Sequence, residues 1–517
     1  MLPALAQAPP QPDTYVPHLL WIWPFVAILL SIAILPLLRR THHWWESNRN
    51  KLLVALALAA VTLLYYGLRG VGRPVHAAHG AGAGAELHAP ETPPPADSLT
   101  AAEERGAAAS ATPGAHQAQP SAAVPPVRRT APGFATVLSV LDHALLAEYV
   151  PFIVLLFSLY VIAGGIVVRG DVRATPYTNT AILGTGGVLA SLIGTTGAAM
   201  LLIRFLLKTN AERRLKVHTV IFFIFIVANI GGSLLPIGDP PLFLGYLRGV
   251  DFFWTLQLWK YWAFMLAILL GLYFLWDSWA YQREAPEAIR LDETQIQPMR
   301  VAGLINVLWL LGVVGAVATL DPAKAFPGTN WHAPPYLREG VQLAMAALSW
   351  LTTSRALRRE NEFNFVAIGE VACLFLGIFI TMQVPIEVLQ TKGPELGLVR
   401  PWQFFWAAGG LSSFLDNAPT YVVYFETAGT LTLPGMEALR NVATATGQIP
   451  VPLLVAISCG AVFMGANTYI GNGPNFMVKA IAEPSGVKMP SFFGYMAYSC
   501  LILIPLFLVL TALFFRV

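Results

Sequence analysis

Two aspartates lie within segments of the chain that are otherwise strongly apolar. Asp239 belongs to GGSLLPIGDPPLF (231–243) and Asp416 to the short stretch FLDNAP (414–419). An ionisable side chain at membrane depth is costly and usually functional. The neighbouring Gly and Pro residues interrupt helices, which frees backbone carbonyls that can coordinate Na⁺, while helix N-termini favour anions. The pattern therefore predicts an ion site at broken helices.

Side chains that carry oxygen accompany the two aspartates, as a hard cation prefers. The predicted ion-binding residues are Asn229, Ser233 and Asp239 in the first interrupted segment, Thr195 and Thr196 in the turn GTTGAA, Ser413, Asp416, Asn417 and Thr420 in the second turn, and Asn467, Thr468, Asn472 and Asn475 in GANTYIGNGPNFM. We expect Na⁺ at Asp416 and Asp239. Two alternatives stay open, since Ser and Thr can bond to their own helix backbone and Gly and Pro can simply kink membrane helices. No Cys/His cluster has metal-ligand spacing and no nucleotide-binding loop is present, so we expect no catalytic residue and no cofactor.

Three kinds of segment occur twice and in the same order. An apolar run that opens on a glutamate is followed by a hairpin turn and then by a Gly/Pro-interrupted segment. The matched positions are Glu148 and Glu370 in the apolar runs and Ala198 and Ala418 in the hairpin turns, while the interrupted segments align without gaps, Gly231 with Gly465 and Pro240 with Pro474. Transporters built from inverted repeats bind substrate where such interrupted segments meet. The sequence therefore predicts inverted repeats, each with a re-entrant hairpin and a broken transmembrane helix.

The composition indicates a membrane environment. Hydrophobic residues make up 56% of the 517 residues and charged residues only 12%, about half of the charged fraction of a soluble globule. Apolar runs recur along the chain, and most reach the roughly 20 residues that cross a bilayer. The predicted fold class is an all-α polytopic membrane protein with about nine full spans plus a hairpin in each half. Asp142, Glu148 and Glu370 are expected near span ends, in structural roles.

Composition also divides the chain into parts. The predicted parts are two N-terminal transmembrane spans (1–69), a disordered Ala/Pro/Gly/His-rich loop (70–135), a first inverted repeat (136–300) with hairpin 177–203 and broken helix 217–247, connecting spans (301–354), and a second inverted repeat (355–517) with hairpin 402–425 and broken helix 451–478. The loop has too few apolar residues to offset the entropy of ordering. Its histidines are irregularly spaced, so we interpret them as incidental rather than metal-binding; they are His76, His79, His88 and His116.

Lys and Arg residues set the predicted orientation. With the loop after the first span in the cytoplasm, the segments on that side hold more than twice as many Lys and Arg residues as the segments on the other side, and this bias marks the cytoplasmic face. The bias holds only if residues 177–203 enter and leave from the cytoplasm and residues 402–425 from the periplasm. The hairpins are therefore predicted to be re-entrant from opposite faces. We expect a multi-pass protein of a bacterial inner membrane.

The chain resembles the ion-transporter superfamily in four segments, which read IGGSLLPIGDPPLFLGYLRGVDFFW, EVACLFLGIFITM, LSSFLDNAPTYV and ANTYIGNGPNFMVKAIAE. It is most similar to NhaD-type sodium/proton antiporters, to which the citrate-transporter and arsenite-permease families are related. The resemblance covers the chain from about Leu145 onwards and leaves out the linker and the first two spans. It implies a homodimer in which scaffold helices hold a mobile transport domain that moves like an elevator.

The hairpin tips depart from one branch of that superfamily. Sodium-coupled dicarboxylate carriers place Ser-Asn-Thr at each tip, where it meets sodium and the substrate carboxylate. This chain has DNAPT (416–420) at the second tip and TTG (195–197) at the first. A fixed negative charge repels a polyanion and can hold Na⁺ and H⁺ alternately, so the departure favours cation/proton exchange.

The sequence leaves two transport functions open. In a Na⁺/H⁺ antiporter, Asp416 and Asp239 compete for sodium and protons, and Asp416→Asn is expected to abolish sodium-dependent proton movement. In a symporter of citrate or another organic anion, coupled to sodium or protons, the broken helices bind sodium and the hairpin N-termini bind carboxylates. A membrane enzyme or structural subunit is disfavoured because no acid/base pair or nucleophile constellation accompanies these segments. The expected partners are these ions, the lipid bilayer and a second copy of the chain, without nucleic acid.

Overall fold

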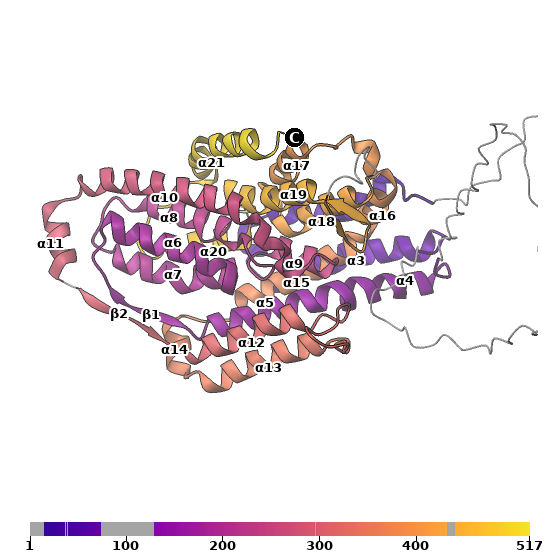
Figure 1. Cartoon of the computed structure of the whole chain (residues 1–517), viewed down its shortest axis with the longest axis horizontal. Coiled ribbons are helices and arrows are strands. Elements are labelled where there is room, and N and C mark those ends of the chain that lie inside the picture. Colours follow the sequence, from indigo (N-terminus) through magenta and orange to yellow (C-terminus); the bar gives the residue numbers. More distant parts are fainter. Residues whose placement is uncertain are drawn as a thin grey trace, which may run out of the picture.

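The computed structural model describes residues 15–36, 38, 40–73, 129–294, 296–431 and 440–516, and these residues fold mostly into helices (Figure 1). The predicted loop 70–135 and its four histidines lie largely outside the described residues. The described helices fall into two groups: one contains neither hairpins nor broken helices, and the other contains the hairpins and broken helices with the long helix that follows each break.

Uninterrupted helices form the first group, here called the frame helices. They are α1 (Trp23–Ile34), α3 (Asn48–Leu68), α5 (Val150–Ala163), α12 (Ile305–Thr319), α13 (Leu337–Thr352) and α15 (Val366–Thr381). Helices α1 and α3 pack on α15, and α12 and α13 pack on α5, as the lower edge of Figure 1 shows for the second set. Helices α12 and α13 therefore have the same place relative to α5 that α1 and α3 have relative to α15.

Hairpins and broken helices form the second group, the core group. In the first half its members are α6 (Pro176–Ile193), α7 (Thr195–Thr209), α8 (Val217–Ile226), η3 (Ile230–Ser233), α9 (Pro240–Leu247) and α10 (Trp259–Tyr281). In the second half they are α17 (Pro401–Ser412), α18 (Asn417–Gly429), α19 (Val451–Met464), η7 (Gly465–Asn467), α20 (Gly473–Ala482) and α21 (Phe492–Phe514). The order of hairpin, broken helix and long helix thus occurs twice. The predicted hairpin segments fall on α6–α7 and α17–α18, and the predicted broken segments on α8–α9 and α19–α20.

Shorter elements connect these helices. They are η1 (Leu19–Ile22), α2 (His42–Trp45), α4 (Phe134–Leu141), η2 (Asp142–Tyr149), β1 (Val167–Asp171), η4 (Phe252–Leu258), α11 (Pro286–Thr294), β2 (Gln297–Ala302), α14 (Arg355–Glu360), α16 (Gln383–Lys392), η5 (Gly393–Leu396), β3 (Asn441–Ala443) and β4 (Gln448–Pro450). Strand β1 leads from the frame helices into the core group and β2 leads back, and the two strands pair antiparallel. Both connections are therefore joined in one ribbon, at the left end of Figure 1.

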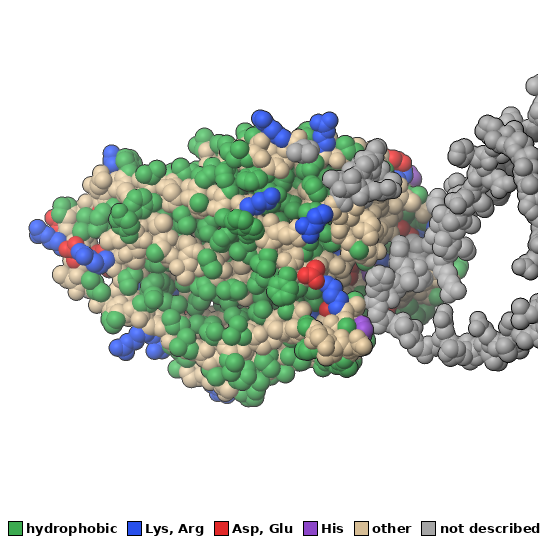
Figure 2. Space-filling view, viewed as in Figure 1, with side chains coloured by type: hydrophobic (Ala, Val, Ile, Leu, Met, Phe, Trp, Pro, Cys, Tyr) green, Lys and Arg blue, Asp and Glu red, His purple; other side chains and the backbone are tan. Residues whose placement is uncertain are grey.

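Long apolar helices account for several membrane spans. Among the described residues, four helices are long and apolar enough to cross a bilayer, and a fifth is added if Val366–Thr381 and Gln383–Leu396, bent by 41°, count as one span. The four are Asn48–Leu68, Phe134–Ala163, Phe252–Tyr281 and Phe492–Phe514. Figure 2 shows hydrophobic side chains over most of the visible face. The chain is thus a multi-pass helical membrane protein, while the larger number of spans expected from the sequence stays a prediction.

One span begins earlier than its apolar run. In the sequence this apolar run opens at Glu148, whereas the continuous helix begins at Phe134 and contains the π-helical turn η2. Asp142 and His143 interrupt the apolar residues before Glu148 and hid this start. Glu148 is buried and pairs with Arg248 across 2.5 Å, and Glu370 pairs with Lys51 across 2.7 Å. Both glutamates are therefore held in ion pairs, and Glu148 lies inside its span rather than at the end.

The two described ends of the predicted loop contact each other. The backbone N–H of Thr130 donates to the carbonyl of Arg73 across 2.9 Å, and the Arg73 N–H donates to the Thr130 hydroxyl across 2.9 Å. A short linker can therefore join the two ends without moving a helix.

Replacing residues 76–126 with a short Gly/Ser linker is expected to leave the folded protein and its transport unchanged. The composition of the segment predicts no packed element, and the contact between Arg73 and Thr130 stays. Thermal unfolding of the purified protein and flux in proteoliposomes measure the two outcomes. A normally inserted variant without flux would give the loop a role in transport.

Candidate functional site

Each hairpin turns sharply at its tip. Gly194 separates α6 from α7 with φ 80°, a conformation that suits glycine because it has no Cβ. In the second hairpin Asp416 caps α18, since its Oδ1 accepts the backbone N–H of Ala418 across 3.0 Å. The first residues of the helices that follow are therefore Thr195 and Asn417.

Those two residues meet on the carboxylate of Asp239. The Thr195 hydroxyl donates to Oδ1 across 3.0 Å, and the Asn417 amide donates to Oδ2 across 2.7 Å. Asn472, which precedes α20, donates to Oδ1 across 3.2 Å. Asp239 is only 1% exposed. Its carboxylate thus receives donors from both hairpins and from the second break, although these lie far apart in the sequence.

The two broken helices also hold each other. The Asn229 amide donates to Asn475 Oδ1 across 2.7 Å, and the Asn472 amide donates to Asn229 Oδ1 across 3.2 Å. The Asn475 amide in turn donates to the carbonyls of Gly465 and Thr468. Backbone carbonyls freed by the second break are therefore satisfied by side chains, as burial requires.

A second polar cluster lies between the second hairpin and the second break. The Asn467 amide donates to the Ser413 hydroxyl across 2.9 Å, and the Thr468 hydroxyl donates to the Ser413 carbonyl across 2.5 Å. Within the described residues, Oδ1 of Asn467 and Oδ1 of Asn417 are buried without a hydrogen-bond partner. Such amide oxygens are suitable ligands for a hard cation.

Four of the predicted residues, Asp416 among them, do not join either cluster. The Thr420 hydroxyl donates to the carbonyl of Asp416, and the Ser233 hydroxyl donates to the carbonyl of Ile230. These bonds to the local backbone are the alternative that the sequence left open. Thr196 follows Thr195 on α7 and is partly exposed, and among the described residues it makes no hydrogen bond to Asp239. The structure thus joins nine of the thirteen predicted side chains in the two clusters, Asp416 caps its own helix beside them, and Thr420 and Ser233 bond to their local backbone.

The two broken helices correspond to each other in a register that differs by one residue from the expected one. In the breaks, Gly238 approaches the Gly232 carbonyl as Gly471 approaches that of Gly465. Asp239 and Asn472 each precede the next helix with similar extended backbone angles. The ungapped alignment of Gly231 with Gly465 and of Pro240 with Pro474 is therefore wrong by one residue, because it ignored that the helix caps must coincide.

The hairpin alignment is shifted as well. Ala198 was matched with Ala418, which placed Asp416 opposite Thr196. In the structure Thr195 and Asn417 start the equivalent helices and donate to the same carboxylate. Asp416 therefore corresponds to Gly194, and the sequence missed this because the tips share few residue types.

Substituting alanine for Gly238 should test how tightly the first break is packed. A Cβ at this position would lie 2.2 Å from the Gly232 carbonyl oxygen, so we expect a loss of about 1–3 kcal/mol of stability, as for other overpacked sites, together with loss of transport. Gly410→Ala is the control, because a Cβ there meets nothing within 4 Å. Thermal unfolding should separate the variants, and equal stability would contradict the packing that we describe.

The charge of the site is uncompensated by nearby bases. Within the described chain neither Asp239 nor Asp416 has a salt bridge to Lys, Arg or His, and Asp416 directly precedes Asn417, whose amide donates to the Asp239 carboxylate. Arg248, which follows α9, does not pair with either aspartate. It pairs instead with Glu148 and with Glu426 on α18. The site therefore presents two neighbouring carboxylates and neutral donors.

Sequence reasoning missed several supporting residues. The Ser191 hydroxyl on α6 donates to the Gly231 carbonyl across 2.5 Å, and on α21 the Tyr495 and Ser499 hydroxyls donate to the carbonyls of Ala466 and Asn467. Each satisfies a carbonyl that a break leaves without a helical partner. Their only sequence signal is a hydroxyl on an otherwise apolar helix.

Apolar helices that surround a buried polar centre of hairpins and breaks define a multi-pass membrane protein of the transporter class. A protein-family profile described as "Putative citrate transport" matches residues 15–80 and 122–515, so the chain belongs to that family. Among curated proteins none matches the chain. The family match includes residues 15–80, so the expectation that the first two spans lie outside the resemblance was wrong. These spans carry no ion-site motif, but they pack on α15 as α12 and α13 pack on α5.

Proposed function

We propose that the protein is a secondary active transporter that exchanges Na⁺ for H⁺ at Asp239 and Asp416. The observation that carries the proposal is the Asp239 carboxylate, buried among Thr195, Asn417 and Asn472 without a basic partner. Uncompensated buried charge is expensive. A bound cation or a proton each neutralises it, so the two compete for one site.

The unpartnered amide oxygens extend this binding site. Asn417 holds Asp239 through its Nδ2 while its Oδ1 has no partner in the described chain. Asn467 has the same arrangement with Ser413. Asn417 and Asn467, with Asp416 and carbonyls of the breaks, supply oxygen ligands of the kind that Na⁺ takes. Thr420 and Ser233 act through the helix backbone.

An elevator motion would carry this site across the membrane. The core group holds every residue of the site. The frame helices pack against the core group, for example α5 against α7. We propose that two inverted repeats, with hairpins entering from opposite faces, build the core group and the frame helices together. The repeats then include α1 and α3 in the first half and α12 and α13 in the second. A homodimer in a bacterial inner membrane completes the proposal.

Symport of citrate or another organic anion is the second candidate, and the description of the family favours it. In that function the N-termini of α7 and α18 would receive a substrate carboxylate. The Asp239 and Asp416 charges oppose it, because they would repel a polyanion at the same tips.

Flux in proteoliposomes tests the two candidates directly. Purified protein is reconstituted with an imposed pH gradient and given NaCl, LiCl or citrate. Antiport predicts that Na⁺ dissipates the gradient in the absence of citrate. Uptake of labelled citrate that requires Na⁺, with no change of the gradient by Na⁺ alone, would replace antiport with symport.

A further inference from the structure

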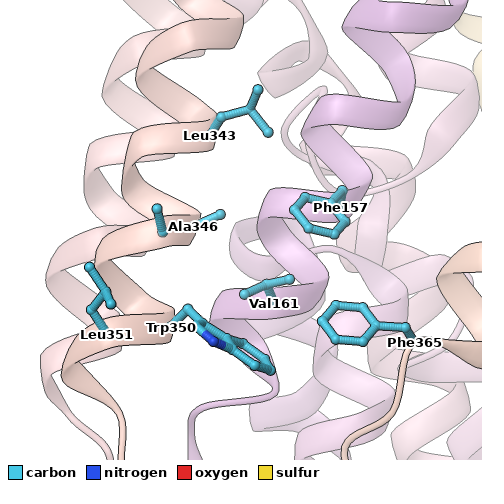
Figure 3. Close-up of a pocket in the computed structure, with 8 residues that line it drawn as sticks. Phe157, Val161, Leu343, Ala346, Trp350, Leu351 and Phe365 are labelled. Atoms are coloured by element: carbon cyan, nitrogen blue, oxygen red, sulfur yellow. The ribbon is translucent and has the colours of Figure 1, made fainter.

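An apolar groove lies on the frame helices, away from the ion site. Its walls come from α5, α13 and the start of α15, and they include Phe157, Leu343 and Phe365 (Figure 3). Two adjoining hollows of about 320 and 360 Å³ share these three residues. Trp350 lines only the first hollow, at one end of the groove, and its ring centroid lies 5.5 Å from that of Phe365. The groove is thus an apolar surface hollow between frame helices.

A buried arginine lies behind that end. The Arg358 guanidinium contacts the Trp350 ring at 4.6 Å and donates to the carbonyls of Val161 and Ser349, which lie in the last turns of α5 and α13. Its Nε is buried without a partner among the described residues, and no carboxylate pairs with it there. Helix C-termini offset only part of a full charge. The end of the groove therefore carries positive charge without a counter-ion.

The neighbouring acidic residues are already paired. Glu360 binds Arg169 and Glu362 binds Arg204, each across 2.7 Å. Arg355 and Arg359 lie four residues apart on α14, and both are exposed. Residues four apart face the same side of a helix. The surface next to Trp350 and Leu351 thus has an unneutralised basic face, and tryptophan favours the level of lipid headgroups.

We propose that this groove binds one anionic phospholipid, with an acyl chain along Phe157 and Leu343 and the phosphate at the basic face of α14. A phospholipid fits both the apolar groove and the basic face, because it joins a long apolar chain to a negative headgroup. Basic pockets between membrane helices bind such headgroups. A second copy of the chain could fill this groove only with a surface that places a carboxylate next to an apolar ridge. This lipid site lies on the frame helices, and the proposal does not depend on which ion the transporter carries.

Filling the groove is the first test. Ala347 is exposed and lines the groove, whereas Ala344 is exposed on the same helix and does not. The purified full chain is delipidated in detergent and titrated with phosphatidylglycerol or phosphatidylcholine of equal chain length. Native mass spectrometry then counts the lipids bound to each protein. We expect wild type and Ala344→Phe to bind one phosphatidylglycerol in preference, and Ala347→Phe to lose it.

Removing the basic face is the second test. Arg355→Gln with Arg359→Gln should weaken phosphatidylglycerol binding about tenfold or more and spare phosphatidylcholine. Arg290→Gln with Arg300→Gln, also exposed, should bind as wild type does. Wild type without a preference, Ala347→Phe that binds normally, or equal losses in both arginine pairs would overturn the proposal. A change from dimer to monomer in Ala347→Phe with lipid binding intact would assign the groove to a protein interface and overturn it as well.

Discussion

Replacing Asp239 with asparagine is expected to reduce sodium-dependent proton movement to the rate of protein-free liposomes. Asparagine keeps the volume of the side chain, and its single oxygen can still accept from Thr195 and Asn472, while its amide group takes the place of the oxygen to which Asn417 donates. It carries no charge and takes no proton near neutral pH, so neither a cation nor H⁺ can be exchanged on it. Dye-monitored pH changes in proteoliposomes after a NaCl pulse give the rate.

Variants of two further aspartates serve as comparisons in this experiment. Asp251 is exposed and pairs with Lys324, so Asp251→Asn should retain wild-type exchange. Asp416→Asn should lose exchange like Asp239→Asn, and its fold should be intact because asparagine is an equally good helix cap. If Asp239→Asn kept exchange at the normal apparent sodium affinity, Asp239 would not be the shared site.

Replacing Arg248 with glutamine should destabilise the protein by about 3–5 kcal/mol, as expected when one partner of a buried ion pair is removed. Arg248 donates to Glu148 across 2.5 Å and to Glu426 across 3.2 Å, and all three side chains are buried. Without Arg248 both glutamates lose this pairing. Glu148 belongs to the span of α5 and Glu426 to the second hairpin, so the contact between frame helices and core group weakens too.

Neutral partners should rescue that loss. Arg248→Gln combined with Glu148→Gln and Glu426→Gln removes all three charges, and its thermal unfolding should recover most of the lost stability. Arg283→Gln, an exposed arginine that stacks on Trp279, is the matched control and should unfold as wild type does. A triple variant as unstable as the single one would show that shape rather than charge is responsible.

The sequence predicted the parts of the site better than their arrangement. Gly and Pro at the breaks and the turns at the hairpin tips are local features, and they placed both breaks and both hairpins. From the motifs alone, Asp239 and Asp416 are equally good candidates for the ion site. Only the fold shows that three neutral donors meet on Asp239, while Asp416 caps its own helix.

Long-range partners account for most of what the sequence missed. Glu148 and Arg248 are separated by a hairpin and a broken helix, so nothing local marks them as a pair. The same holds for Ser191 and Ser499, which bond to carbonyls of the breaks. The alignment of the two hairpins and of the two broken helices was shifted for a related reason, because it followed residue identity where it should have followed the helix caps.

Proton release on sodium binding tests the central claim most directly. Purified protein in detergent, in weakly buffered solution with a pH-sensitive dye, receives NaCl or an equal concentration of choline chloride, while bound ²²Na⁺ is counted on the same sample. Competition at Asp239 predicts that Na⁺ releases protons in proportion to the sodium bound, and that Asp239→Asn releases none. Sodium that binds to wild type without releasing protons would contradict the account.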